Sequence, residues 1–170
     1  MERKYAEFAA TKACELLAID SPSGYTQKAA TWVKEAFEAL GFAAKITTKG
    51  SVLADLGGAD KDDALFLQAH TDTLGAMVAE VKANGRLQLT PLGGLRAENA
   101  ETENVRVHTR TGKIIEGTVQ LCNASVHVNG EYGETKRTFD TVEVVLDEDV
   151  KTAEATRALG IEVGDIVCLE

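Results

Sequence analysis

The sequence contains few cysteines and few prolines, and each shortage excludes a class of protein. Three cysteines, Cys14, Cys122 and Cys168, stand far apart, and none forms a C-x-x-C pair. This spacing argues against a disulfide framework or a zinc knuckle, and it favours reduced thiols in the cytoplasm. Only two prolines are present, and neither a Pro-rich linker nor a low-complexity tract interrupts the chain.

Long apolar runs and positive charge are also scarce. No run approaches the ~20 apolar residues that a membrane span needs, and the first residues lack the apolar core of a signal peptide. We therefore expect no membrane association. The formal net charge of -9 repels phosphate backbones, so nucleic acid is not an expected partner. The remaining composition, with 44% hydrophobic and 26% charged residues, is typical of one compact globular domain or two small ones.

Apolar periodicity predicts two helices followed by short strands. A spacing of three and four residues indicates an amphipathic helix over residues 2–18, and a second begins near Thr26 and ends at Gly41. Extended pieces follow at residues 42–47, 51–56 and 64–70, the last of them (ALFLQAH) almost continuously apolar. This order predicts an α/β fold whose sheet is covered on both faces. Functional groups gather beyond the carboxyl ends of such strands, which is where His70 lies.

After Asp72 the pattern becomes mostly β. One hairpin is predicted around Asn84-Gly85, whose residues would supply the positive φ angles of a tight turn, and another around Thr111-Gly112. A strand over residues 141–146 and a short helix ending at Gly160 complete the segment. Turns recur every 8 to 12 residues or so, which is typical of a small barrel or sandwich.

The triplet His70-Thr71-Asp72 is the main candidate for chemistry. Residues i and i+2 of a strand point to the same face, so the carboxylate of Asp72 can reach the imidazole of His70. A carboxylate that accepts one ring N–H fixes the tautomer and leaves the other nitrogen for a metal ion. The alternative is coincidence. With 3 histidines and 27 acidic residues in 170, such a pair arises by chance in roughly half of comparable chains.

Other candidate residues have structural interpretations. His108 alternates with valines and is expected to be half-exposed in a sheet, and His127 is expected to pack in a turn-rich segment. The acidic loop GGADKDD lacks the spacing of a calcium-binding loop. Ser23 has neither a base nor an oxyanion motif nearby, so we do not assign it as a nucleophile.

Several motifs occur in an order that resembles a known family. They are SPSGYTQ after the first helix, GSVLA, FLQAHTDTLGAMV, LTPLGG and LGIEVGDIV. Together they resemble the N-terminal part of the cobalt- or zinc-dependent aminopeptidases of the glutamyl/deblocking type, which include tetrahedral dodecameric enzymes. The resemblance covers essentially the whole chain.

The resemblance implies a partial zinc-exopeptidase-like α/β sandwich with an inserted small β-barrel that serves dimerisation. Residues 1–72 would belong to the catalytic domain, residues 73–165 to the barrel, and residues 166–170 to the return into the catalytic domain. His70 would be a metal ligand, and Asp72 the catalytic-site carboxylate that orients it. The intact enzyme would hold two divalent ions, zinc or cobalt, whereas this chain would form at most one partial site.

The implied activity is removal of N-terminal residues from peptides by metal-activated water, in a cytoplasmic homo-oligomer assembled through the barrel. The family's remaining ligands would follow Glu170, so we expect the chain to be an N-terminal fragment that is inactive alone. We also expect its first ~70 residues to be less stable than the barrel. An alternative is a non-catalytic assembly or regulatory module built on the same fold. A glycosidase, which some relatives' cellulase labels would suggest, is disfavoured because aromatic residues make up only 5%.

Overall fold

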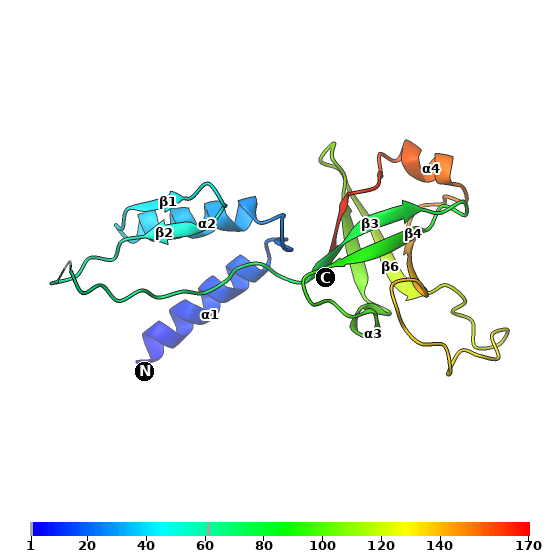
Figure 1. The fold of residues 1–170 in the computed structure, drawn as a ribbon, viewed down its shortest axis with the longest axis horizontal. Helices are drawn as coiled ribbons and strands as arrows, with labels where there is room; N and C mark the ends of the chain where they lie inside the picture. Colours follow the sequence, from blue (N-terminus) through cyan, green and yellow to red (C-terminus); the bar gives the residue numbers. More distant parts are fainter. Residues whose placement is uncertain (1, 61) are drawn as a thin grey trace. The chain divides into compact units, whose positions relative to one another are not determined.

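The computed structural model describes residues 2–60 and 62–170 of the chain, and it divides into two compact units (Figure 1). The first unit ends at Thr73 and the second runs from Leu74 to Glu170. Within these residues, no helix combines the length and the apolar character needed to cross a membrane.

The first unit contains two helices and one small hairpin. Helix α1 spans Arg3–Leu17 and helix α2 spans Gln27–Ala39, which confirms both predicted helices. Gly41 follows α2 with a φ of 89°, the left-handed conformation expected of a glycine that ends a helix. Strands β1 (Ala44–Ile46) and β2 (Val52–Ala54) pair antiparallel and lie beside α2 (Figure 1).

The first unit buries little apolar surface. No residue of α1 is buried, and Tyr5 and Phe8 on its apolar stripe are 56% and 49% exposed. In α2 only Ala29 and Ala30 are buried. Burial of apolar side chains is the main favourable term in folding, so these helices receive little tertiary stabilisation from the described residues.

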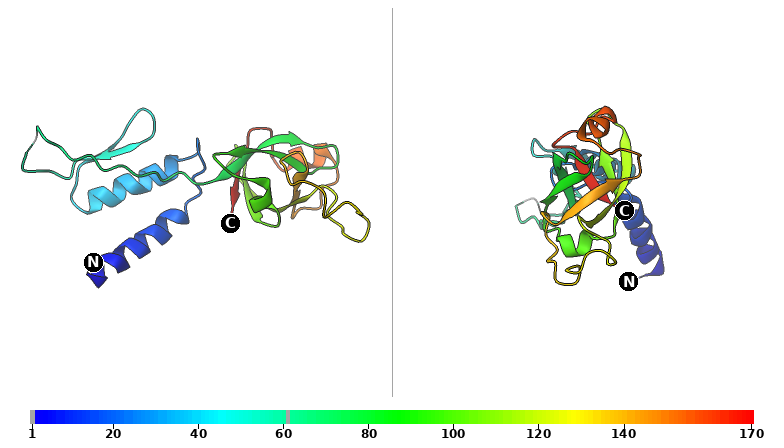
Figure 2. Two further views of the ribbon diagram at one scale, coloured as in Figure 1. Left: turned by 60° about the horizontal axis from the view of Figure 1, so that its bottom comes forward. Right: turned by 90° about the vertical axis from the view of Figure 1, so that its right-hand side faces the viewer.

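The apolar run at residues 64–70 is not a strand, and this prediction is wrong. Residues 64–70, which follow β2, form neither a helix nor a strand (Figure 2). Leu65, Phe66 and Leu67 are 85%, 71% and 74% exposed. An apolar sequence becomes a strand only where another strand lies beside it, and none of the described strands pairs with this segment.

The second unit is a closed barrel of six antiparallel strands in the order β3-β4-β7-β6-β5-β8. The strands are β3 (Gly75–Val81), β4 (Leu87–Leu92), β5 (Asn104–His108), β6 (Ile114–Leu121), β7 (Val142–Leu146) and β8 (Ile166–Leu169). Two short helices, α3 (Ala97–Ala100) and α4 (Ala153–Ala158), lie between strands. The predicted α/β class with a small β-barrel is therefore confirmed.

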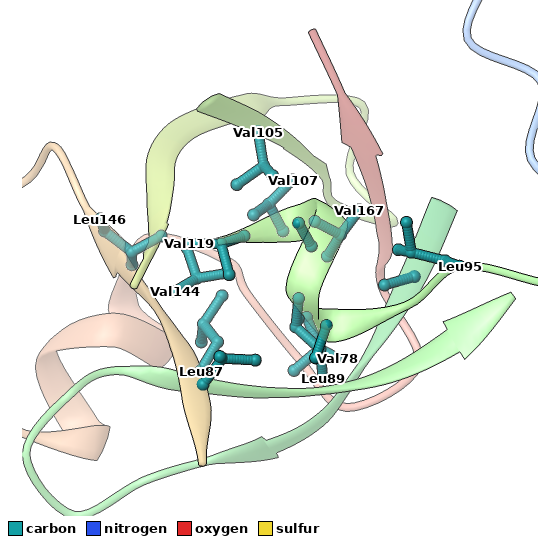
Figure 3. Close-up of a cluster of buried hydrophobic side chains, with 14 of the residues drawn as sticks. Val78, Leu87, Leu89, Leu95, Val105, Val107, Val119, Val144, Leu146 and Val167 are labelled. Atoms are coloured by element: carbon teal, nitrogen blue, oxygen red, sulfur yellow. The ribbon is translucent and has the colours of Figure 1, made fainter. Parts of the chain in front are cut away.

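The interior of the barrel is filled by branched aliphatic side chains from all six strands (Figure 3). Alternation along each strand places them there: in β6, residues 117, 119 and 121 are buried while their neighbours are more exposed. The main members are Val78, Leu87, Leu89, Val105, Val107, Val119, Val144, Leu146 and Val167. The barrel therefore contains the principal hydrophobic core of the described chain.

The first hairpin of the barrel turns differently from the prediction. Gly85 has a φ of 83°, but Asn84 is not among the described residues with a positive φ. The backbone N–H of Lys82 donates to the carbonyl of Arg86 at 2.8 Å, and the Asn84 side chain accepts from the Arg86 N–H at 3.1 Å. The loop therefore needs one left-handed residue, not two.

Candidate metal-ligand site

His70 and Asp72 lie in the first unit, just before the chain enters the barrel. Because residues 64–70 form no strand, His70 does not stand at the end of a buried strand as predicted. Its side chain is 85% exposed and that of Asp72 is 42% exposed. The imidazole is thus accessible rather than enclosed by packed aliphatic side chains.

The predicted contact between the two side chains is present in the structure. Nδ1 of His70 lies 3.1 Å from Oδ1 of Asp72 and 3.1 Å from the backbone oxygen of the same residue. Both neighbours accept hydrogen bonds, so this geometry favours a proton on Nδ1. The lone pair of Nε2 is then available, and no hydrogen-bond partner for Nε2 occurs within residues 2–60 and 62–170.

Ser23, which the sequence analysis did not assign to this site, contacts the second oxygen of the carboxylate. Its hydroxyl donates to Oδ2 of Asp72 at 2.5 Å. The pKa of Asp72 lies below its usual value, mainly because of this bond, which together with the contacts to His70 outweighs the opposing effect of burial. The carboxylate therefore remains ionised and able to accept the imidazole N–H.

The backbone around Ser23 is tied to the backbone around Asp72. The hydroxyl of Ser21 donates to the carbonyl of Thr71 at 2.8 Å, and the N–H of Thr73 donates to the carbonyl of Ser21 at 2.9 Å. Pro22 and Thr73 form an isolated parallel bridge. These contacts join two segments about fifty residues apart in the sequence. Both segments belong to the motifs that resemble the aminopeptidase family, but no sequence pattern predicted that they touch.

Within residues 2–60 and 62–170, no third ligand accompanies the pair. Among the described residues, His70 and Asp72 are not part of any group of three histidine, cysteine or carboxylate side chains close enough to share an ion. The other two histidines differ from their predictions. His108 is buried in β5 rather than half-exposed, and His127 is exposed rather than packed. All three cysteines lack disulfide bonds, as predicted.

The sequence matches the M42 glutamyl aminopeptidase family over residues 50–170. It is also 37% identical over 156 residues to a protein of Bacillus subtilis (strain 168) named Putative aminopeptidase YhfE, an alignment that covers 92% of this chain and 45% of that protein. The chain belongs to the M42 glutamyl aminopeptidase family. It spans less than half the length of this relative.

Solved structures of an aminopeptidase and of a TET peptidase share the fold. An aminopeptidase from the archaeon Desulfurococcus kamchatkensis matches with a TM-score of 0.78 at 23% identity, covering 92% of this chain and 41% of its own. The TET1 peptidase of Pyrococcus horikoshii, described as able to assemble into a tetrahedron or a large octahedral shell, matches with a TM-score of 0.76 at 18% identity. That match covers 95% of this chain and 46% of the TET1 chain.

Proposed function

We propose that this chain supplies the N-terminal portion of a metal-dependent aminopeptidase, in which His70 is a metal ligand and Asp72 orients it. The observation that supports this most directly is the 3.1 Å contact between Nδ1 of His70 and the Asp72 carboxylate. This contact leaves Nε2 of the exposed His70 ring available to bind a metal ion. The chain belongs to a peptidase family, which supports the same function. A bound zinc or cobalt ion would polarise the scissile carbonyl and activate water.

The residues present fit one position of such a site and no more. A neutral imidazole held by a carboxylate is a common zinc and cobalt ligand. Two-metal hydrolysis, however, needs roughly five or six protein ligands and a carboxylate base. Since no third ligand joins His70 and Asp72 within the described residues, this chain would hold at most a partial site. We therefore expect it to be inactive alone.

The proposal extends to domains, substrates, assembly and location. Residues 1–72 would form part of the catalytic domain and residues 73–165 the inserted barrel. Residues 166–169, predicted from the sequence as the beginning of the return to the catalytic domain, form strand β8 of the closed barrel and would belong with it. The substrates would be peptides, shortened from their N-terminus. The barrel would mediate homo-oligomerisation, which agrees with the described shells of the TET1 peptidase. The absence of disulfides fits a cytoplasmic location.

Binding of cobalt to His70 can be tested directly by NMR. Paramagnetic Co²⁺ should broaden the ring signals of His70 at lower concentration than those of the other histidines. His70→Ala should abolish the strongest effect. His127→Ala is the matched control, because His127 is also exposed but has no aspartate two residues later. Equal broadening of His70 and His127 would contradict the proposed ligand.

Activity provides the second test. The chain should show no turnover of aminoacyl-nitroanilides with either cobalt or zinc, because no third ligand joins His70 and Asp72 among the described residues. Turnover comparable to that of a full-length family member would show that the chain forms a complete site and would overturn the proposal of a partial one.

A second candidate function is a non-catalytic assembly or regulatory module. The contrast between a barrel with a continuous core and a first unit that buries few side chains favours this alternative. The mass of the chain in solution, measured with and without a full-length relative, distinguishes the two. Association with the full-length relative without any turnover would favour a module. Monomeric behaviour under both conditions would count against a module and also against homo-oligomerisation through the barrel.

A further inference from the structure

We infer that Ser23 is a positioning residue that fixes the tautomer and orientation of His70 by acting through the Asp72 carboxylate. The inference rests on the proposed function for its purpose, since it deepens the role of His70 as a ligand. Its physical content, however, concerns only three side chains of this chain and can be tested without a metal.

The two oxygens of the Asp72 carboxylate have separate partners. Oδ2 accepts the hydroxyl proton of Ser23 at 2.5 Å, and Oδ1 lies 3.1 Å from Nδ1 of His70. A planar carboxylate held at both oxygens cannot rotate about its Cβ–Cγ bond without breaking one of these contacts. Ser23 therefore determines where Oδ1 points, and Oδ1 in turn determines where the imidazole N–H points.

Ser23 is itself held in place by the hydrogen bonds of Ser21, two residues earlier in the same turn. The bonds between Ser21 and the segment Thr71–Thr73 hold the turn that carries Ser23 against the segment that carries Asp72. Ser21 is only 1% exposed, so these bonds are shielded from water. The backbone therefore already holds the Ser23 hydroxyl close to the Asp72 carboxylate. This reduces the entropic cost of the hydrogen bond between them.

Because the His70 imidazole is exposed, its orientation and tautomer depend on its hydrogen bonds to Asp72. With 85% of its side chain in solvent, His70 has little packing to fix its ring. An unrestrained neutral imidazole in water favours a proton on Nε2, the nitrogen that a metal would need. The backbone oxygen and the carboxylate of Asp72 both favour a proton on Nδ1, because hydrogen bonding decides the tautomer. The carboxylate makes the stronger, charge-assisted contribution, and it does so only while Oδ1 stays in line with Nδ1.

The test is the tautomer of His70 in the metal-free 170-residue chain. Long-range ¹H–¹⁵N spectra report which ring nitrogen carries the proton, and His70→Ala assigns the signals among the three histidines. At about pH 8.5, where an ordinary imidazole is neutral, the unmodified chain should show mainly the Nδ1–H form. Ser23→Ala should lower the ratio of Nδ1–H to Nε2–H by at least about threefold, because a hydrogen bond to a charged group is lost.

Matched variants separate positioning from a simple structural role. Ser21→Ala removes one of the two bonds that hold the turn but leaves the Ser23 hydroxyl and its bond to the carboxylate, so it should lower the tautomer ratio clearly less than Ser23→Ala does. Ser23→Thr keeps the hydroxyl and should restore the ratio. Ser23→Cys keeps the approximate volume with a weaker donor and should give an intermediate ratio, which preserves the test if the alanine variant does not fold.

Three outcomes would overturn the inference. They are an Nε2–H form in the unmodified chain, a ratio that Ser23→Ala and Ser23→Cys leave unchanged, or an effect of Ser21→Ala as large as that of Ser23→Ala. Failure of the proposed function would give a different result. Co²⁺ would then not broaden the His70 signals selectively, although the tautomer ratio would still change with the Ser23 variants as expected.

Discussion

Glu143 on β7 accepts a hydrogen bond from the Arg86 guanidinium at 2.5 Å while its own side chain is only 3% exposed. The ammonium of Lys82 donates to the second carboxylate oxygen at 2.9 Å. Glu143 alternates with Val142 and Val144, which belong to the barrel core, so its side chain lies on the opposite face of the strand. The positive charges of Arg86 and Lys82 therefore compensate the negative charge of the buried Glu143 carboxylate, which lies outside the hydrophobic core.

Replacing this carboxylate should destabilise the barrel at neutral pH. Burial by itself would raise the pKa of Glu143, but the bonds from Arg86 and Lys82 together outweigh it and hold the pKa below its usual value. We expect Glu143→Gln to lower the free energy of unfolding by about 1–3 kcal/mol at pH 7, since both cations retain partial access to water. Urea denaturation followed by circular dichroism measures this change.

The same carboxylate predicts how stability depends on pH. Its folded pKa is depressed, so its contribution is complete above the unfolded pKa of about 4.3 and is lost as pH falls through the folded value. The urea midpoint of the unmodified barrel should therefore decrease more steeply than that of Glu143→Gln below about pH 4.5. Glu148→Gln, on an exposed residue, is the control and should keep the original slope. Parallel slopes for all three proteins would contradict the assignment.

A third prediction concerns the close approach of β6 to β7 at Gly117. A Cβ built on Gly117 would lie 2.6 Å from the backbone oxygen of Val145 and 2.9 Å from Cγ1 of Val144. Gly117→Ala should therefore force backbone movement and cost about 1–3 kcal/mol of barrel stability. Gly130→Ala is the matched control, because a Cβ there meets nothing within 4 Å. An unchanged urea midpoint for Gly117→Ala would show that the strands can separate without cost.

Local patterns predicted most of the barrel, whereas contacts between distant residues could not be predicted. Strands β5 and β6 follow from apolar alternation and from a glycine turn, both of which are properties of neighbouring residues. Strand β8 pairs with β3 and β5, far away in the sequence, and it was not predicted as part of the barrel. The bond from Ser23 to Asp72 spans 49 residues and has no periodic signal.

The error at residues 64–70 has the same physical origin. A continuous apolar run indicates a buried strand only if the chain provides neighbours on both sides of it. The contact between His70 and Asp72 was nevertheless predicted correctly. It requires only that the two residues stand two positions apart, and it forms here without a strand. Local spacing was therefore enough to predict the candidate ligand pair, but not its surroundings.

A fourth prediction follows from the exposed run Leu65–Leu67. Replacing all three residues by serine should change the free energy of unfolding by less than about 0.5 kcal/mol per residue, because little packing is lost. It should also reduce binding of the dye ANS, which reports exposed apolar surface. Serine at Val126 and Val128, exposed by 57% and 78% in the barrel unit, is the control for removing apolar surface elsewhere. A large loss of stability in the first variant would mean that these side chains are packed in solution.

The two units should differ in hydrogen exchange. Helix α1 has 15 residues and none is buried, and an isolated helix of this length is only marginally stable in water. Amides of β6 and β7 are paired within a closed barrel around a buried core, so they should exchange only through much larger unfolding events. Exchange followed by mass spectrometry should therefore show fast labelling of peptides from α1 and residues 64–70, and slow labelling of peptides from β6 and β7.

Gly117→Ala gives this experiment an internal control. If the barrel is an independent cooperative unit, the substitution should accelerate exchange in β6 and β7 by roughly the factor expected from its stability loss, about tenfold for each 1.4 kcal/mol. Exchange in α1 should not change, because its opening does not require the barrel to unfold. Uniformly strong protection of both units, or acceleration of α1 together with the barrel, would show instead that the first unit derives its stability from the barrel.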